Sequence, residues 1–227
     1  VYVDDLCASG PADELKRLWK ELGYEFPIGE LGPCKEFLGM KVDVRTVGDF
    51  RELIIDMRDY AKMIVKVWQE QNSSSRLTAA WTPMSNDLRK EEQTPTTPRK
   101  DVQKLIGMLL WISRCARPDI MFALSRLGTC VARWTSKCDK QLARVVGYLE
   151  QTSGRREDLV LVMRMHVDDT HNDLRSVLYT DADLSVPRSQ SGYFYCLESD
   201  RGSMLPIHWG SKKQSVCADS TGASELI

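Results

Sequence analysis

Residues 142–165, LARVVGYLEQTSGRREDLVLVMRM, contain the change of periodicity that decides the fold class. The first half of this stretch predicts a helix that Gly154 ends, because four apolar residues recur there at helical spacing. These four residues are Leu142, Val145, Val146 and Leu149. The apolar run at residues 159–165 has instead the length and composition of a strand. A boundary between a helical part and a strand-rich part is therefore expected near Arg156.

The segments on either side extend this division. Upstream, three apolar faces predict three more amphipathic helices, and the first of these should stop at Gly23. The faces consist of Leu15, Leu18, Trp19 and Leu22; of Tyr60, Met63, Ile64, Val67 and Trp68; and of Val102, Leu105, Ile106 and Leu109. Short apolar runs predict strands at residues 37–44, 50–55, 177–180, 193–197 and 205–209. Strands with a helix, then helices, then strands form an α+β pattern.

The charge of the chain is unevenly distributed. The net charge is −1, but residues 99–156 hold 12 Lys or Arg against four Asp or Glu, a local balance of +8. A basic segment of this kind can neutralise the phosphates of a nucleic acid, and it can equally be the solvated surface of helices. The charge pattern alone leaves both interpretations open.

The cysteine spacing and the apolar runs argue against several classes of protein. The seven cysteines include no Cys-x-x-Cys spacing, so we expect reduced thiols in an intracellular protein rather than a zinc site or a secreted disulfide framework. The longest apolar run, residues 105–112, is too short to cross a bilayer, and no membrane partner is expected.

Two groups of carboxylates are candidates for metal binding. Asp4 and Asp5 follow a short apolar run, where a tight hairpin could bring one or both to a cation, although a surface turn is the simpler interpretation. Asp181 ends a predicted strand, and Glu225 lies in the first turn of a helix that Ser220-Thr221 would cap. An Asp on a strand and a Glu on a helix can converge on a pair of Mg²⁺ ions, with unrelated surface carboxylates as the alternative.

A series of short motifs runs along nearly the whole chain. In order they are Val1-Tyr2-Val3-Asp4-Asp5, residues 31–40 (LGPCKEFLGM), Thr82-Pro83-Met84, residues 105–111 (LIGMLLW), Arg117-Pro118-Asp119-Ile120, residues 145–152, Asp181-Ala182-Asp183, Ser191-Gly192-Tyr193, residues 209–214 (WGSKKQ) and Ser220-Thr221. In this order and spacing they resemble the reverse transcriptase and ribonuclease H region of Ty1/copia-type retrotransposon Pol polyproteins. Each motif is weak alone, but the ordered set is specific.

The resemblance implies a division of the chain into three parts. Residues 1–56 would be the end of a reverse transcriptase palm, and residues 57–157 a helical thumb or connection. Residues 158–227 would be the N-terminal part of an RNase H-like domain, with the first three strands of its mixed sheet. Both ends of the chain are expected to be cuts through a longer polyprotein.

The resemblance also implies roles for single residues. The catalytic metal ligands would be Asp4 and Asp5 in the polymerase, and Asp181 and Glu225 in the ribonuclease H, with Mg²⁺ or Mn²⁺ as the cofactor. Trp209 would orient the third strand of the RNase H-like sheet. The residues expected near nucleic acid are Tyr2, Phe37, Leu38, Gly39 and Lys212.

In the parent enzyme these sites would catalyse two-metal phosphoryl transfer. The partners would be a primer–template with a dNTP, and an RNA–DNA hybrid, in cytoplasmic virus-like particles or in the nucleus. Because each site would hold only part of its ligands, the fragment alone is expected to be inactive. The alternative is a non-catalytic nucleic-acid-binding remnant of a retroelement, in which the basic residues 99–156 would matter more than the acids.

Overall fold

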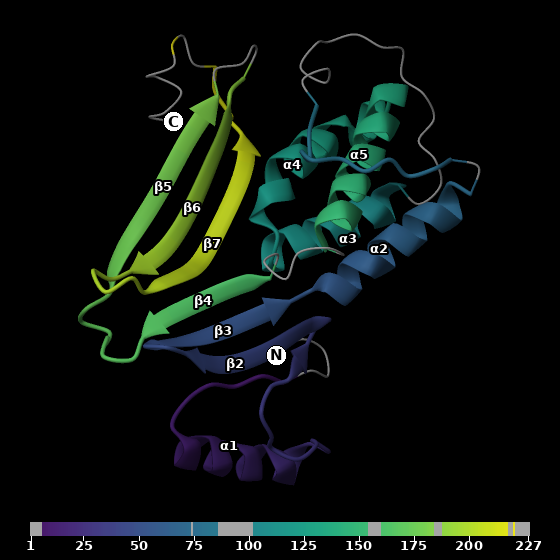
Figure 1. The fold of residues 1–227 in the computed structure, drawn as a ribbon. Coiled ribbons are helices and arrows are strands. Elements are labelled where there is room, and N and C mark those ends of the chain that lie inside the picture. The colour runs from purple at the N-terminus through teal and green to yellow at the C-terminus, as the bar shows by residue number, and fades with distance from the viewer. Residues whose placement is uncertain are drawn as a thin grey trace.

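The computed structural model describes residues 6–73, 75–85, 102–153, 160–183, 188–217 and 220, and its elements form an α+β fold (Figure 1). The α-helices are α1 (Ala12–Glu25), α2 (Arg58–Gln71), α3 (Val102–Cys115), α4 (Met121–Cys130) and α5 (Ser136–Ser153). The strands are β1 (Glu36–Phe37), β2 (Met40–Val47), β3 (Phe50–Asp56), β4 (Leu161–His166), β5 (Arg175–Asp183), β6 (Gln190–Glu198) and β7 (Met204–Lys213). The α+β class that the order of elements predicts is confirmed.

The seven strands form one open sheet in the order β1-β2-β3-β4-β7-β6-β5. All pairs among the described strands are antiparallel, so these strands do not show the mixed sheet that the family resemblance implies. Strand β4 pairs with β3 along its whole length but with β7 at the single pair Arg164↔Met204. The sheet therefore has two halves, and from their junction β5–β7 rise beside the helices while β2–β4 run beneath them (Figure 1).

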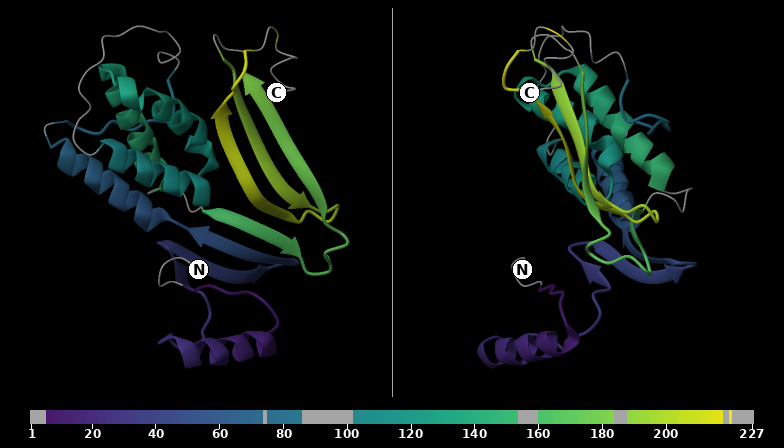
Figure 2. Two further views of the ribbon diagram at one scale, coloured as in Figure 1. Left: turned by 180° about the vertical axis from the view of Figure 1, so that it is seen from behind. Right: turned by 90° about the vertical axis from the view of Figure 1, so that its left-hand side faces the viewer.

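Helices α2 to α5 form a bundle that holds the main core (Figure 2). The buried faces of α2, α3 and α5 follow the predicted periodicity, although Met63, placed on the apolar face of α2 by its spacing, is 43% exposed. The most completely buried side chains of the bundle are Ile64, Leu105, Leu109, Ile112, Leu124, Leu127, Val145, Val146 and Leu149. Among the described residues, no helix is both long and apolar enough to span a membrane.

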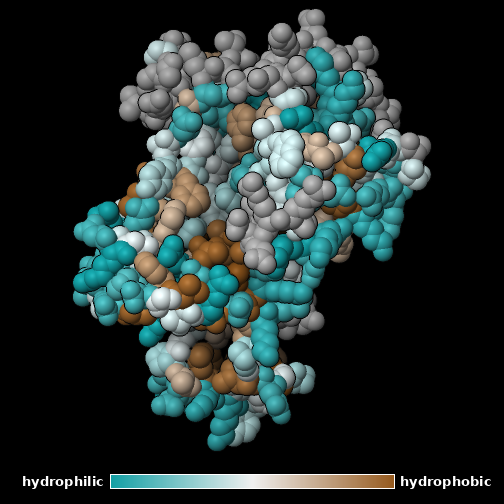
Figure 3. Space-filling model, in the orientation of Figure 1, coloured by the Kyte–Doolittle hydropathy of each residue, from teal (hydrophilic) through white to brown (hydrophobic). Residues whose placement is uncertain are grey.

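Helix α1 lies apart from this core, beyond β2 (Figures 1 and 2). None of its residues is buried, and Leu18 on its apolar face is 41% exposed. Figure 3 shows hydrophobic atoms exposed at the bottom of the molecule, where Figure 1 has α1. The face is held by the segment that follows, where Trp19 Nε1 donates to the Gly29 carbonyl oxygen at 2.8 Å. The predicted end of the helix at Gly23 is wrong, because α1 continues to Glu25. Glycine lowers the stability of a helix but can still adopt its conformation.

The predicted strand at residues 37–44 is also wrong in one respect, because a tight turn interrupts it. Leu38 and Gly39 connect β1 to β2 with φ values of 51° and 77°. A two-residue hairpin of this kind needs positive φ at both central positions. Leucine is uncommon in turns, and the left-handed conformation costs it roughly 1–2 kcal/mol. The sequence pattern therefore does not predict a turn here.

A buried guanidinium ties the start of α4 to the end of α5. Arg117, which is 3% exposed, donates from Nε and Nη2 to both carboxylate oxygens of Asp119 at 2.9 and 2.7 Å. Its Nη2 also donates to Thr152 Oγ1 at 2.9 Å, and Tyr148 Oη donates to Asp119 at 2.9 Å. Burial, and then the Asp119 charge, raises the pKa of Tyr148 and keeps the phenol protonated as a donor. The Arg-Pro-Asp-Ile motif is therefore a structural junction.

A second buried charge secures the junction between the two halves of the sheet. Asp169, 7% exposed, lies in the loop between β4 and β5 and accepts hydrogen bonds from the hydroxyls of Ser199 and Ser203. Arg201 Nη1 donates to the same carboxylate at 2.8 Å. These hydrogen bonds, first those from the two serines, lower the pKa of Asp169 to about 2. The loop after β4 is thereby fixed to the turn between β6 and β7.

The segment at residues 75–85 crosses α5 and is held by the helix through main-chain groups. Gln141 Nε2 donates to the Pro83 carbonyl at 2.6 Å, and Arg144 Nε donates to the Thr82 carbonyl at 3.1 Å. At Gly147 the approach is so close that an added Cβ would lie 2.1 Å from the carbonyl oxygen of Thr78. Only glycine fits this contact.

Gly147→Ala is therefore expected to destabilise the protein by about 1–3 kcal/mol, although alanine is the better helix former. The measurement is the free energy of unfolding from urea titration. Gly107→Ala in α3 and Gly128→Ala in α4 are matched controls, since an added Cβ meets no atom within 4 Å at either position. These controls should raise stability by up to about 1 kcal/mol, and a stabilising Gly147→Ala would contradict the close contact.

The Asp169 cluster predicts a specific loss of stability in acid. The folded pKa lies below the ordinary value of 3.8, so the contribution of the carboxylate is complete above about pH 4 and is lost as the pH falls toward 2. Thermal melting between these pH values should show a steeper acid decline in the wild type than in Asp169→Asn. The exposed neighbour Asp168 provides the isosteric control, and Asp168→Asn should keep the wild-type decline.

Candidate active site

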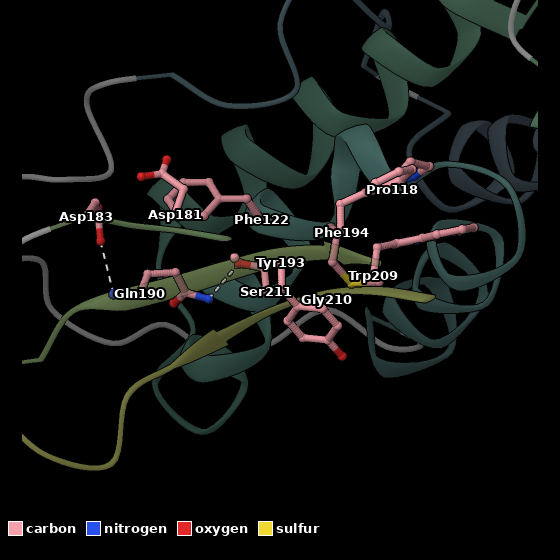
Figure 4. Close-up of a pocket in the computed structure, with 12 residues that line it drawn as sticks. Pro118, Phe122, Asp181, Asp183, Gln190, Tyr193, Phe194, Trp209, Gly210 and Ser211 are labelled. Carbon is pink, nitrogen blue, oxygen red and sulfur yellow. Dashed lines mark hydrogen bonds between the residues drawn. The ribbon is translucent and has the colours of Figure 1, made fainter. Parts of the chain in front are cut away.

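Strand β5 brings Asp181 to the face of the sheet that α4 covers. In the register of the three strands, Asp181 lies opposite Gly192, which lies opposite Ser211. Residues directly opposite each other point to the same face, and the face alternates along each strand. Asp181, Asp183 and Gln190 therefore share one face, and Figure 4 shows them at one end of the hollow that Phe122 of α4 borders.

The space between this face and α4 is a cavity of about 430 Å³. Its two ends differ in chemistry, with the carboxylates of Asp181 and Asp183 at one end and the stacked rings of Phe194 and Trp209 at the other (Figure 4). Asp181 is exposed and Asp183 is half-buried. Two carboxylates beside an apolar cavity can offer oxygen ligands to a cation at its mouth.

Gln190 holds the end of β5 in place relative to its neighbours. The residue is 3% exposed, and its amide nitrogen Nε2 donates to Ser125 Oγ of α4 at 2.9 Å and to Ser211 Oγ of β7 at 2.8 Å. Its backbone N–H donates to Asp183 Oδ1 at 3.0 Å. Nothing in the sequence pattern marks Gln190, because its partners are remote along the chain.

Trp209 attaches the three-stranded half of the sheet to the bundle. Its ring is 8% exposed, and Nε1 donates to the carbonyl oxygen of Ser113 in α3 at 2.8 Å. The ring also stacks on Phe194 at 6.0 Å between centroids. The packing predicted for Trp209 is confirmed, and the assignment of its strand to an RNase H-like sheet stays a prediction.

Lys212 lies on the other side of the sheet from Asp181. It pairs with Ser191, which lies opposite Ala182, so its side chain alternates away from the face that carries the carboxylates. The side chain is exposed. A role for Lys212 in nucleic-acid contact stays a prediction, but any phosphate that it contacts lies across the sheet from the cavity.

The other predicted site residues fall in two groups. Phe37, Leu38 and Gly39 form the tip of the β1–β2 hairpin, where Gly39 is exposed. The remaining ones, Tyr2, Asp4, Asp5 and Glu225, lie outside the described residues. Within the part of the chain that the structure describes, no group of three or more His, Cys, Asp or Glu side chains is arranged to hold a metal ion. Asp181 and Asp183 are carboxylates on one face of β5, and the convergence of Asp181 with Glu225 on a metal ion stays a prediction.

Three proteins resemble this chain over almost its whole length. They are the putative transposon Ty5-1 protein of Saccharomyces cerevisiae, 27% identical over 94% of this chain, and the retrovirus-related Pol polyprotein from transposon TNT 1-94 of Nicotiana tabacum, 24% identical over 100%. An uncharacterized mitochondrial protein of Arabidopsis thaliana is 24% identical over 99%. The chain derives from a copia-type retroelement Pol polyprotein. The family that the motif order suggests is thereby confirmed.

The share of the relatives that is covered differs widely. This Pol-derived chain spans 65% of the Ty5-1 protein, 16% of the TNT 1-94 polyprotein and 87% of the mitochondrial protein. No family model matches the sequence, and no solved structure matches the fold. The comparisons therefore relate this chain to a part of such polyproteins, and they do not identify the domain or its activity.

Gln190→Leu is expected to lower the free energy of unfolding by about 1–3 kcal/mol, because it removes two buried side-chain hydrogen bonds at nearly constant volume. Chemical denaturation measures the change. Gln103→Leu, at an exposed position of α3, is the matched control and should alter stability by less than about 0.5 kcal/mol. Equal effects of the two substitutions would contradict the role of Gln190 as a link between α4 and the sheet.

Proposed function

We propose that this chain is part of the reverse transcriptase and ribonuclease H region of a copia-type Pol polyprotein, and that Asp181 is one of the ribonuclease H acids in the parent enzyme. The relation to Pol polyproteins over the whole chain carries this proposal. The position of Asp181 supports it, because the carboxylate stands at the end of a strand in a three-stranded antiparallel sheet and borders a cavity.

The proposed division has residues 1–56 as the end of the palm, residues 57–157 as thumb or connection, and residues 158–227 as the start of the RNase H-like domain. The α2–α5 bundle supports the second part. Strands β5–β7 support the third, since they form a separate half of the sheet. Strand β4 lies within residues 158–227 but pairs along its length with β3 of the first part. In this proposal the three strands of the RNase H-like part would therefore be β5, β6 and β7.

In this proposal Asp181 and Glu225 would hold Mg²⁺ or Mn²⁺ for the ribonuclease H, and Asp4 and Asp5 would do so for the polymerase. The metal ions would supply charge stabilisation for phosphoryl transfer. The chain's own described residues would position the substrate and the metal ligands. Gln190 and Trp209 would hold the Asp181 strand against the bundle, and the Leu38-Gly39 turn would contact the primer strand of a primer–template. An RNA–DNA hybrid would be the second substrate.

A non-catalytic nucleic-acid-binding remnant is the second candidate function. The observation that favours it is the set of exposed cations on the bundle and its connections, which comprises Lys104, Arg114, Arg133 and Lys140. If these side chains bind phosphates, affinity for duplex or hybrid should fall linearly on a log–log plot against salt, with a slope near −0.9 per phosphate contact. A slope near zero would favour a solvated helical surface.

The isolated chain is expected to show no turnover with Mg²⁺ on a labelled RNA–DNA hybrid or a primer–template, because an incomplete carboxylate set cannot hold two cations. Denaturing gels of the labelled strand measure the reaction. Primer extension that Asp4→Asn abolishes, or hybrid cleavage that Asp181→Asn abolishes, would contradict this expectation.

The complementary test of the proposed function uses a longer piece of the parent polyprotein. There Asp181→Asn should reduce hybrid cleavage by roughly a hundredfold or more. Asp200→Asn, at an exposed turn carboxylate, is the control and should leave cleavage unchanged. Unchanged cleavage by the Asp181→Asn variant would refute its role as a ribonuclease H acid.

A further inference from the structure

Helix α1 is weakly attached to the rest of the described chain. It has no buried residue and makes no extensive contact with another described helix or strand. Its hydrogen bond from Trp19 ends on Gly29, which lies in the segment that follows the helix. Figures 1 and 2 show α1 beyond β2, joined to the sheet by the segments before and after it. The position of α1 therefore depends on how these two segments are held.

The two segments meet at a pair of cysteines. Cys7 lies before α1 and Cys34 lies after it, and their thiols form a hydrogen bond with each other. Residues 6–73 are described without a gap, so the described structure contains both cysteines and everything between them. The sequence pattern gives no sign of this pair, because the whole of α1 separates its two members.

The second member of the pair is fixed to the sheet. The residue after Cys34 is Lys35, whose carbonyl oxygen accepts a hydrogen bond from the Val42 N–H of β2 at 2.8 Å. Glu36 then pairs with Lys41 at the start of the β1–β2 hairpin. A covalent bond between the two cysteines would therefore tie the segment before α1 to the sheet.

Both thiols of this pair are exposed, so a dissolved oxidant can reach them. Two thiols in contact need only small side-chain rotations to adopt the geometry of a disulfide. A second pair provides a contrast, because the thiols of Cys130 and Cys138 also form a hydrogen bond, but Cys138 is 3% exposed. Access to the oxidant, in addition to contact, distinguishes Cys7 and Cys34.

We propose that Cys7 and Cys34 are an oxidisable pair whose disulfide closes residues 7–34 into a covalent loop that contains α1. The oxidant is a small disulfide of the oxidised-glutathione class. A thiolate of the pair attacks this disulfide and releases one glutathione thiolate. The second thiolate of the pair then attacks the mixed disulfide and releases the other. The two cysteine thiols lose two protons and two electrons, and one glutathione disulfide becomes two molecules of glutathione.

The reaction should be slow at neutral pH. Desolvation of the sulfur, and then the hydrogen bond with Cys7, raise the pKa of the Cys34 thiol above its ordinary value of 9.0. Because the thiolate is the attacking species, the rate of oxidation should rise by about tenfold between pH 7 and pH 8. A rate that is independent of pH would contradict the proposed exchange.

The disulfide should restrain α1 without any new packing. A closed loop has fewer conformations available when α1 unfolds locally, so local unfolding becomes less favourable. Amide hydrogen exchange in α1 should therefore be slower by about tenfold or more in the oxidised protein than in the reduced protein. The Cys34→Ser variant, treated with the same oxidant, should keep the exchange rate of the reduced protein.

The bond itself is tested by treating the full chain with oxidised glutathione at pH 8, followed by alkylation, trypsin digestion and mass spectrometry. Cleavage at the basic residues of α1 places Cys7 in peptide 1–16 and Cys34 in peptide 21–35. The expected product is a linked pair of these peptides, lighter by two hydrogen atoms than the sum of the separate peptides. Cys217→Ser, at an exposed cysteine outside the pair, is the matched control and should leave the linkage unchanged.

Four outcomes would overturn the proposal. They are the absence of the linked peptides, linkage of Cys217 to either cysteine in equal yield, oxidation of Cys130 with Cys138 at an equal rate, and unchanged hydrogen exchange in α1 of the oxidised protein. The peptide mapping uses the unaltered chain, so it does not depend on the folding of a variant. The inference goes beyond the proposed function and uses none of its candidate metal ligands, so either can fail without the other.

Discussion

The buried carboxylate of Asp169 is the interaction on which the arrangement of the whole sheet depends. Strands β4 and β7 share only the pair Arg164↔Met204, too little to fix the angle between two half-sheets. The Asp169 carboxylate adds the strongest further link, because Ser199, Ser203 and Arg201 all donate to it from the β6–β7 turn. The backbone N–H of His166 in β4 also donates to Ser203 Oγ at 2.8 Å. Burying a charge is unfavourable unless it is fully hydrogen-bonded. Separating the β4–β5 loop from the β6–β7 turn would break the hydrogen bonds of Asp169, so the two segments are held in a fixed relative position.

The position of the candidate site follows from this junction and from two contacts farther along the strands. Trp209 binds the α3 carbonyl of Ser113, and Gln190 binds Ser125 of α4. The half-sheet β5–β7 is thus held at its base by an ionic cluster and along its face by the bundle. The cavity beside Asp181 is the space that these contacts leave between strand and helix. The shape of the cavity therefore depends on residues from two of the proposed parts of the chain, residues 57–157 and residues 158–227.

The sequence pattern predicted helix faces and a strand, because the spacing of apolar residues along the chain determines these features. The buried faces of α2, α3 and α5 follow from apolar spacing, and the middle of strand β5 follows from the short apolar run before Asp181. Three features could not be predicted. The Leu38-Gly39 turn uses a residue without turn preference, the joining of β4 to β3 brings together segments about a hundred residues apart, and the side of the sheet that Lys212 occupies depends on register. Periodicity carries no information about any of these.

The crossing of residues 75–85 over α5 explains how such a fold can persist while its sequence drifts. Gln141 and Arg144 bind carbonyl oxygens of Pro83 and Thr82, and Gly147 admits the carbonyl of Thr78. A main-chain oxygen is present whatever side chain its residue carries. These three contacts therefore survive a change of side chain in the crossing segment, whereas the helix side of the contact has few acceptable substitutions. Side chains of the segment also contribute, since Arg144 Nη2 donates to Thr82 Oγ1 at 2.7 Å and Ala80 is buried. Relatives that share only about a quarter of their residues with this chain can retain the same crossing on these terms.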